Sequence, residues 1–138
     1  MILLDTNVFS EFMLPEPDKR VVLWLDRQPK SSIWTTSINI YEVRAGLLAM
    51  PKGRRRSGLE LHFGRILQVL IQNRIFDFDA ASAERAAELS ADRRSHGRPV
   101  DVRDTMIAGI VLATHATLAT RNVRHFEDIA AHVVNPWE

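Results

Sequence analysis

The sequence contains no cysteine among its 138 residues, which excludes a disulfide framework, an iron–sulfur cluster and a thiolate zinc site. It also lacks a long hydrophobic run, since the longest uncharged stretch, residues 105–120, includes His115 and several threonines. That stretch is too short and too polar to span a membrane, so it predicts a buried helix running into a buried strand. No basic segment precedes residues 2–4, and Asp5 interrupts that apolar run, so we expect no signal peptide and a cytoplasmic protein.

The chain has no marked excess of either charge, because its formal net charge is +1, yet its basic residues are unevenly placed. Residues 44–74 carry seven basic groups and one acidic group, with a cluster at residues 52–56 that is expected to form a turn. Most of the basic residues are arginine, whose planar guanidinium suits bidentate contact with phosphate. The cluster therefore indicates either a contact with nucleic acid or a solvated helix face, and both interpretations stay open.

Short β-rich segments alternate with segments of helical spacing along the chain. Hydrophobic residues make up 46% and charged residues 25%, which is globular composition, and the length predicts one domain over residues 1–138. The expected strands are residues 2–4, 33–36, 75–79, 118–120 and 133–134, and the expected helices are 8–13, 18–28, 37–50, 59–71, 80–95 and one beginning at 101. This alternation predicts an α/β fold with a mainly parallel central sheet and helices on both of its faces.

Four polar side chains are expected at one edge of this sheet. Asp5 directly follows the first strand, and Glu42 lies early in the helix after the second. Asp104 is near the start of the long apolar helix, and Asn122 follows the fourth strand. Ligands of such sheets bind beyond the carboxyl ends of the strands, so these side chains are expected to converge there. Each acid also has a structural explanation as a helix cap, and Asp101 is expected to be an N-cap.

The three acids are flanked by apolar residues, so their carboxylates need a partner. Arg44 and Arg103 are the basic residues close to them in sequence. A cluster of like charges repels itself unless a cation neutralises it, and oxygen ligands without sulfur favour Mg²⁺ or Mn²⁺. A metal bound by carboxylates activates a water and stabilises charge on a phosphoryl group.

Five segments, collinear over nearly the whole chain, carry a family pattern. They are MILLDTNVFSE (1–11), TS (36–37) before YEVRAG (41–46), GRPV (97–100) with DTMIAG (104–109), LATRNVRHF (118–126) and HVVNPW (132–137). Together they resemble the PIN domain of VapC-type toxins, and the last segment resembles the FitB branch of that family. The resemblance implies a PIN-like three-layer α/β/α fold.

The resemblance further implies a Mg²⁺- or Mn²⁺-dependent endoribonuclease that is the toxin of a type II toxin–antitoxin pair. Asp5, Glu42 and Asp104 match the family's metal-binding acids. Its fourth acidic position falls on Asn122, which brings an amide and no charge, so one well-held cation is expected. A second departure is His125, where an acid is frequent in the family.

Supporting roles also follow from the family match. The hydroxyls of Thr6 and Thr120 would orient a ligand or water. Arg121 and Arg44 would either hold the RNA backbone or pair with the acidic cluster. A metal-activated water would attack the scissile phosphorus and leave a 5′-phosphate.

The implied partners are RNA, a VapB- or FitA-like antitoxin whose tail lies across the acidic groove, and operator DNA bound mainly through that antitoxin. A homodimer and a larger toxin–antitoxin assembly are expected as well. Two alternatives remain: a non-catalytic PIN-like subunit that binds its antitoxin and takes part in operon regulation, and a nuclease acting on DNA. The retained carboxylates favour the ribonuclease, because such a cluster without a cation would destabilise the fold.

Overall fold

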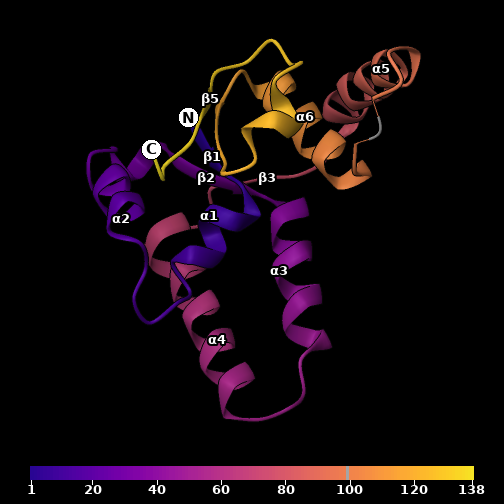
Figure 1. The fold of residues 1–138 in the computed structure, drawn as a ribbon. Coiled ribbons are helices and arrows are strands. Elements are labelled where there is room, and N and C mark those ends of the chain that lie inside the picture. Colours follow the sequence, from indigo (N-terminus) through magenta and orange to yellow (C-terminus); the bar gives the residue numbers. More distant parts are fainter. Residues whose placement is uncertain (99) are drawn as a thin grey trace.

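The computed structural model describes residues 1–98 and 100–138, and its centre is a five-stranded sheet in which every strand pair is parallel (Figure 1). The strands are β1 (Ile2–Leu4), β2 (Ile33–Thr36), β3 (Ile75–Phe76), β4 (Thr117–Ala119) and β5 (Val133–Val134). Their order is β3-β2-β1-β4-β5, so β1 is central. The predicted parallel α/β architecture is thereby confirmed.

Helices fill the connections between the strands. They are α1 (Thr6–Glu11), α2 (Lys19–Asp26), α3 (Ser37–Ala49), α4 (Arg54–Arg65), α5 (Ala80–Ser95) and α6 (Val102–Thr114). Shorter helical segments are η1 (Lys30–Ser32), the π-helical η2 (Ile66–Ile71) and η3 (Val123–Phe126). Within the described residues, four helices begin after an aspartate whose carboxylate accepts a backbone N–H, and these caps are Asp5, Asp18, Asp79 and Asp101.

The sheet separates two hydrophobic layers because successive side chains of a strand point to opposite faces. Leu4 packs into a cluster formed with α1, α2, α3 and α4, whereas Leu3 packs into a cluster formed mainly with α6 and β4. Accordingly, α1 to α4 lie on one side of the sheet in Figure 1, and α5 and α6 lie on the other. The expected three-layer arrangement is confirmed.

Three details differ from the expectations. The strand predicted at 75–79 pairs with β2 only through Ile75 and Phe76, since the Asp79 N–H turns back to the Asp77 carbonyl. The basic cluster is not a turn, because residues 54–56 form the first turn of α4. The predicted helix 59–71 changes to π-helical geometry at η2. Within the GRPV segment, Pro99 lies outside the described residues.

The apolar stretch after Asp104 forms α6 and then β4, as predicted. Ile107, Ala108, Ile110 and Val111 of α6 are fully buried against the sheet and α5. In the part of the chain that the structure describes, no helix is long and apolar enough to cross a membrane.

Gly109 marks a close approach of α6 to α5. A Cβ atom at this position would lie 2.5 Å from the Ser82 carbonyl oxygen and 2.7 Å from the Ala86 Cβ. Since these atoms belong to a packed helix, Gly109→Ala is expected to lower the free energy of unfolding by about 1–3 kcal/mol. Urea denaturation measures this change.

Gly64 in α4 supplies the matched control, because a Cβ there would meet no atom within 4 Å. Gly64→Ala is expected to raise stability by up to about 1 kcal/mol through helix propensity. Equal midpoints for wild type and Gly109→Ala would contradict the tight α5–α6 contact.

Candidate active site

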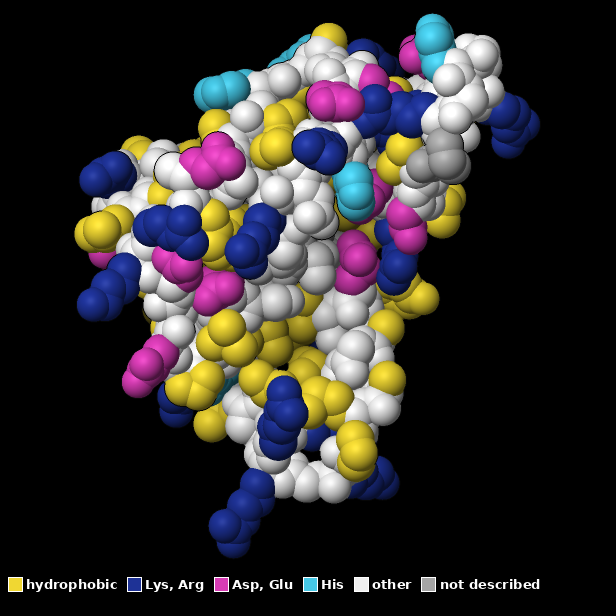
Figure 2. Space-filling view, viewed as in Figure 1, with side chains coloured by type: hydrophobic (Ala, Val, Ile, Leu, Met, Phe, Trp, Pro, Cys, Tyr) yellow, Lys and Arg dark blue, Asp and Glu magenta, His cyan; other side chains and the backbone are white. Residues whose placement is uncertain are grey.

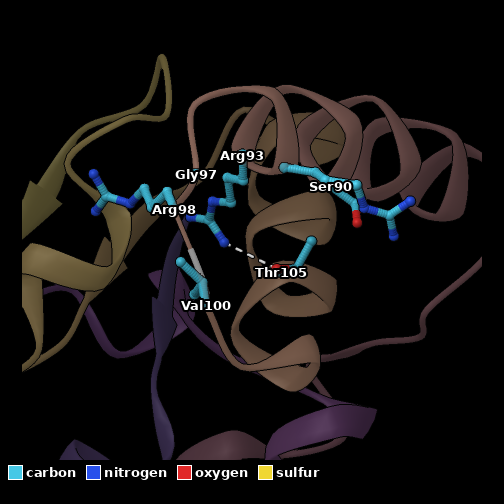
Figure 3. A pocket seen from close by; sticks show the side chains of 7 residues that line it. Ser90, Arg93, Gly97, Arg98, Val100 and Thr105 are labelled. Carbon is cyan, nitrogen blue, oxygen red and sulfur yellow. Dashed lines mark hydrogen bonds between the residues drawn. The ribbon is translucent and has the colours of Figure 1, made fainter.

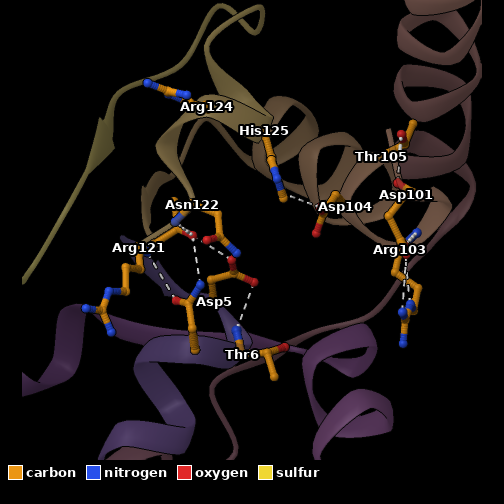
Figure 4. A network of polar contacts seen from close by, with 12 residues as sticks. Asp5, Thr6, Asp101, Arg103, Asp104, Thr105, Arg121, Asn122, Arg124 and His125 are labelled. Carbon is orange, nitrogen blue, oxygen red and sulfur yellow. Dashed lines mark hydrogen bonds and ion pairs between the residues drawn. The ribbon is translucent and has the colours of Figure 1, made fainter. Parts of the chain in front are cut away.

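The predicted polar side chains gather at the carboxyl ends of β1, β2 and β4 (Figure 4). Asp5 leaves β1, Glu42 lies in the second turn of α3, and Asp104 lies in the first turn of α6. Asn122 begins the post-β4 loop, residues 122–128, and lies beside Asp5 in Figure 4. Parallel strands bring these elements together because their carboxyl ends share one edge of the sheet.

Asp5 is the buried centre of this group, with 4% of its surface exposed. One carboxylate oxygen accepts the Thr6 backbone N–H at 2.8 Å and the Asn39 amide at 3.2 Å, and the other accepts the Thr120 hydroxyl at 2.7 Å. Among the described residues, no arginine, lysine or histidine forms an ion pair with it. Burial raises the pKa of Asp5, and the negative charge of Asp104 acts in the same direction.

Glu42 faces the same site from α3. Its Oε1 accepts the Thr6 hydroxyl at 3.1 Å, and its Oε2 lies 3.8 Å from the Arg103 guanidinium. Burial raises the pKa of Glu42, and the charges of Asp5 and Asp104 raise it further. Glu42 therefore belongs to the acidic group and does not close a capping box, since Thr36 caps α3 by accepting the Asn39 N–H.

Asp104 completes the group, and its carboxylate contacts a histidine that was not assigned to it from the sequence. Its Oδ2 lies 2.9 Å from Nδ1 of His125, which comes from the post-β4 loop. In Figure 4 the His125 ring points down toward this carboxylate. His125, at the position where the family often has an acid, is thus part of the site.

Asp101 is a helix cap, as expected. Its carboxylate accepts the Arg103 backbone N–H at 2.7 Å and pairs with the Arg103 guanidinium at 3.2 Å. These hydrogen bonds lower the pKa of Asp101. Arg103 therefore links the cap of α6 to Glu42 at the rim of the site.

Arg44 and Arg121 form no ion pair with Asp5, Glu42 or Asp104 within the described chain, whereas the alternative, contact with the RNA backbone, stays a prediction. The Arg44 guanidinium stands over the Phe63 ring, 4.8 Å from its centroid, and lies 3.9 Å from Glu60 of α4. The Arg121 guanidinium stands over the Trp137 ring at 4.9 Å, and its side chain points away from Asp5 in Figure 4. Cation–π contacts with nearby aromatic rings explain both orientations.

The amide side chains of Asn39 and Asn7 were missed by the sequence analysis. Asn39 is buried, and its Nδ2 donates to both Asp5 and Thr6. Asn7 donates to the Thr120 hydroxyl at 3.4 Å and accepts the Arg121 backbone N–H at 3.2 Å. The available signal was a polar residue between Ile38 and Ile40, one helical turn before Glu42.

Thr6 and Thr120 contact the acids, and their orienting of a ligand or water stays a prediction. Thr6 donates its hydroxyl to Glu42 and its backbone N–H to Asp5. The Thr120 hydroxyl donates to Asp5 and accepts the Asn122 backbone N–H at 3.0 Å. The two threonines therefore connect three of the four predicted site residues.

The chemistry of these side chains fits a hard divalent cation. The donors are carboxylate oxygens, the central one is buried without a cationic partner, and burial has raised the pKa of two of them. Over residues 1–98 and 100–138, no three acidic or histidine side chains stand close enough to enclose an ion as they lie. The donor set therefore suits Mg²⁺ or Mn²⁺, but it is not a closed metal cage.

A partly apolar groove of about 250 Å³ runs from the acids between α1, α3 and α4. Its lining includes Met13, Leu14, Leu47 and Leu59 beside Thr6 and Glu42. Figure 2 shows hydrophobic side chains in this hollow and Lys or Arg side chains below it, toward the α3–α4 connection. Of the basic cluster there, Arg54 and Arg55 are exposed, whereas Arg56 pairs with Glu60 at 3.1 Å.

Comparison with known proteins gives matches that span nearly the whole chain. A family model described as PIN domain matches residues 2–132. The chain is 40% identical over 138 residues to the plasmid stability protein StbB of Pseudomonas syringae pv. tomato, covering 100% of this chain and 99% of that protein. It is 36% identical over 139 residues to VapC ribonuclease Y4jK of Sinorhizobium fredii, again covering 100% and 99%. A solved structure of FitAB bound to an IR36 DNA fragment matches with a TM-score of 0.90 and 33% identity, covering 100% of this chain and 96% of that chain.

Proposed function

This chain belongs to the PIN domain family, and on that premise we propose that it is a metal-dependent endoribonuclease, the toxin of a VapBC-type toxin–antitoxin pair. The observation that carries the proposal is the buried Asp5 carboxylate, which lies at the same sheet edge as Glu42 and Asp104. Asp5 has no ion-pair partner in the described chain, whereas Glu42 and Asp104 lie near Arg103 and His125. Y4jK, a relative of this chain, is named a VapC ribonuclease, which supports RNA as the substrate.

Asp5, Glu42 and Asp104 would hold Mg²⁺ or Mn²⁺ through carboxylate oxygens. When bound there, such a cation lowers the pKa of a water for attack on phosphorus and offsets negative charge on the phosphate. The chain's own contribution is orientation: Thr6, Thr120 and Asn39 fix Asp5 by hydrogen bonds.

The residues at the rim of the site determine the net negative charge near a bound phosphodiester. The Arg103 guanidinium lies near Glu42 and offsets part of its charge. Asn122 stands where many family members have an acid, so this site carries one negative charge fewer. This substitution is also the observation that favours the second candidate, a non-catalytic subunit that binds its antitoxin and takes part in operon regulation.

The apolar groove beside Glu42 supports a protein partner, an antitoxin whose tail would cover the acids. Its apolar lining would bury side chains of an antitoxin segment, and the carboxylates would attract a basic residue at the end of the groove. The matched FitAB structure contains DNA, which supports contact with operator DNA through the assembly. A homodimer and a cytoplasmic location complete the proposal.

The test is an RNA cleavage assay with antitoxin-free protein and a pool of structured RNAs. We expect cleavage with Mn²⁺ or Mg²⁺, products that carry a 5′-phosphate, and complete inhibition by a chelator. Cleavage that persists in excess chelator would contradict the metal-dependent mechanism. Cleavage of single-stranded DNA without cleavage of RNA would favour the DNA nuclease, and absence of both Mn²⁺ binding and cleavage in folded protein would favour the non-catalytic subunit.

A further inference from the structure

Arg93 of α5 is a buried charged residue that lies outside the acidic group, with only 3% of its surface exposed. Its Nε and Nη2 donate to the two oxygens of Asp128 at 2.8 and 2.9 Å. Nη2 also donates to the His125 carbonyl at 2.8 Å, and Nη1 donates to the Thr105 hydroxyl at 2.9 Å. A buried guanidinium is stable only when its donors are satisfied in this way.

These bonds join three separate pieces of chain around Asp104. Thr105 is the next residue of α6, and His125 is the residue whose ring contacts the Asp104 carboxylate at 2.9 Å. The hydroxyl of the residue after Asp104 and the backbone carbonyl of His125 therefore both accept hydrogen bonds from one guanidinium. The planar fork of arginine makes this possible, because its N–H groups point in fixed, different directions.

A cavity of about 440 Å³ opens between α5 and the start of α6, and Arg93 and Thr105 form part of its wall. Figure 3 shows the Arg93–Thr105 hydrogen bond at the edge of this hollow. The bonds of Arg93 therefore link α5, the first turn of α6 and the post-β4 loop at the edge of this cavity, in addition to the packing of α6 against α5.

A second arginine fastens the same loop from outside. Arg98 donates to the Arg124 carbonyl, lies 3.3 Å from Glu127 and approaches Asp128 at 3.7 Å. Its side chain is 29% exposed and its partners are on the surface, so solvent weakens these contacts. The bidentate contact of the buried Arg93 with Asp128 is therefore the stronger of the two anchors.

We propose that Arg93 is a positioning residue for the acidic site: through Asp128, the His125 carbonyl and Thr105 it holds the His125–Asp104 pair in place. The positioning of His125 rests on the contacts alone, whereas the consequence for cation binding rests on the proposed function. Replacing a residue that orients a metal ligand, without contacting the metal itself, changes metal affinity by about 10- to 100-fold.

Arg93→Lys is the test variant, because lysine keeps the charge and loses the fork. Arg74→Lys is the matched control. Arg74 also spans elements through Nε and Nη2, which donate to the carbonyls of Ile33, Lys30 and Leu70 at 2.6–2.8 Å, at the opposite edge of the sheet. Both substitutions are expected to lower the melting temperature, so a merely destabilising effect appears in both.

Two measurements at fixed pH separate positioning from stability. The ¹⁵N chemical shifts of the His125 ring report its contact with Asp104. They are measured in metal-free protein through the carbon-bound ring protons, and the His125→Gln variant assigns them. Titration calorimetry with Mn²⁺, at a temperature where each variant is folded, reports the affinity. We expect Arg93→Lys to move the His125 shifts and to weaken Mn²⁺ binding by about 10- to 100-fold, and Arg74→Lys to change neither.

Unchanged His125 shifts and unchanged Mn²⁺ affinity in folded Arg93→Lys would overturn the proposal. If Arg93→Lys does not fold, Thr105→Val removes one bond of the guanidinium with little change of shape, and the same criteria apply to it. If wild-type protein binds no Mn²⁺, the proposed function fails, and the His125 shifts alone decide the role of Arg93.

Discussion

Replacing Asp5 with asparagine is expected to lower the rate of metal-dependent RNA cleavage by at least about 10²–10³-fold while the protein stays folded. Asp5 is the buried carboxylate of the site, and asparagine removes its charge without changing its shape. Asparagine is also a good N-cap, so it can still accept the Thr6 N–H that starts α1. The expected result is therefore a folded protein that has lost catalysis.

The stability of this variant follows from the direction of the pKa shift. Burial raises the pKa of Asp5, so folding makes its ionised form less favourable than in the unfolded chain. Asparagine removes that cost but leaves the Thr120 hydroxyl proton without its present acceptor. The two effects oppose each other, and we expect a net change within about 1 kcal/mol in metal-free protein.

Asp79→Asn is the matched control, since Asp79 is also an N-cap aspartate and lies outside the site. Hydrogen bonds from Ser82 lower the pKa of Asp79, so its ionised form is favoured in the folded state. Asparagine there is expected to reduce stability slightly and to leave cleavage unchanged. Full activity of Asp5→Asn, with activity of Asp79→Asn equal to wild type, would refute the assignment of Asp5.

Saturating Mn²⁺ is expected to raise the melting temperature of the wild-type protein by about 5–10 °C at pH 7.5. A ligand that binds only the folded state contributes about 2.7 kcal/mol at 100 times its dissociation constant, and a domain of this size gains a few degrees per kcal/mol. Excess chelator is expected to reverse the shift. Differential scanning fluorimetry measures both effects.

This stabilisation depends on pH in a defined direction. Burial raises the pKa of both Asp5 and Glu42 above their unfolded values. In metal-free protein their contribution to stability is therefore fully present below the unfolded pKa values and is lost as the pH rises through the folded ones. The Mn²⁺-dependent rise in melting temperature is expected to be largest at neutral pH and to shrink on acidification, because protons compete for the same oxygens.

Two controls separate specific binding from screening of charge. Potassium chloride at equal ionic strength should leave the melting temperature nearly unchanged, and Asp5→Asn should lose most of the Mn²⁺ effect. A shift of the same size in Asp5→Asn, or with potassium chloride, would show that the cation acts only through ionic strength.

The positions of the acids could be predicted because they follow from local and periodic features. Asp5 ends an apolar strand, and Asp104 begins an apolar helix. In a parallel sheet these points meet at one edge whatever the details of packing. The family pattern over five segments added the chemistry that spacing alone does not specify.

The partners of the arginines could not be predicted in the same way. Arg44 is next but one to Glu42 in α3, yet successive helical residues point in different directions, and its guanidinium lies over Phe63 of α4. Arg121 follows Thr120 directly, yet its side chain reaches the Trp137 ring at the end of the chain. Proximity in sequence therefore did not indicate which side chains these two guanidinium groups contact.

The sequence by itself determined the alternation of strands and helices, the Asp101 cap, and the edge of the sheet at which the acids lie, because periodicity and chain order govern these features. Only the tertiary structure decided which side chains hold those acids. His125 contacts Asp104, which is 21 residues away in the sequence, and Arg93 contacts Asp128, which is 35 residues away. Such contacts depend on how α5, α6 and the post-β4 loop pack against one another, and no local pattern of residues specifies this packing.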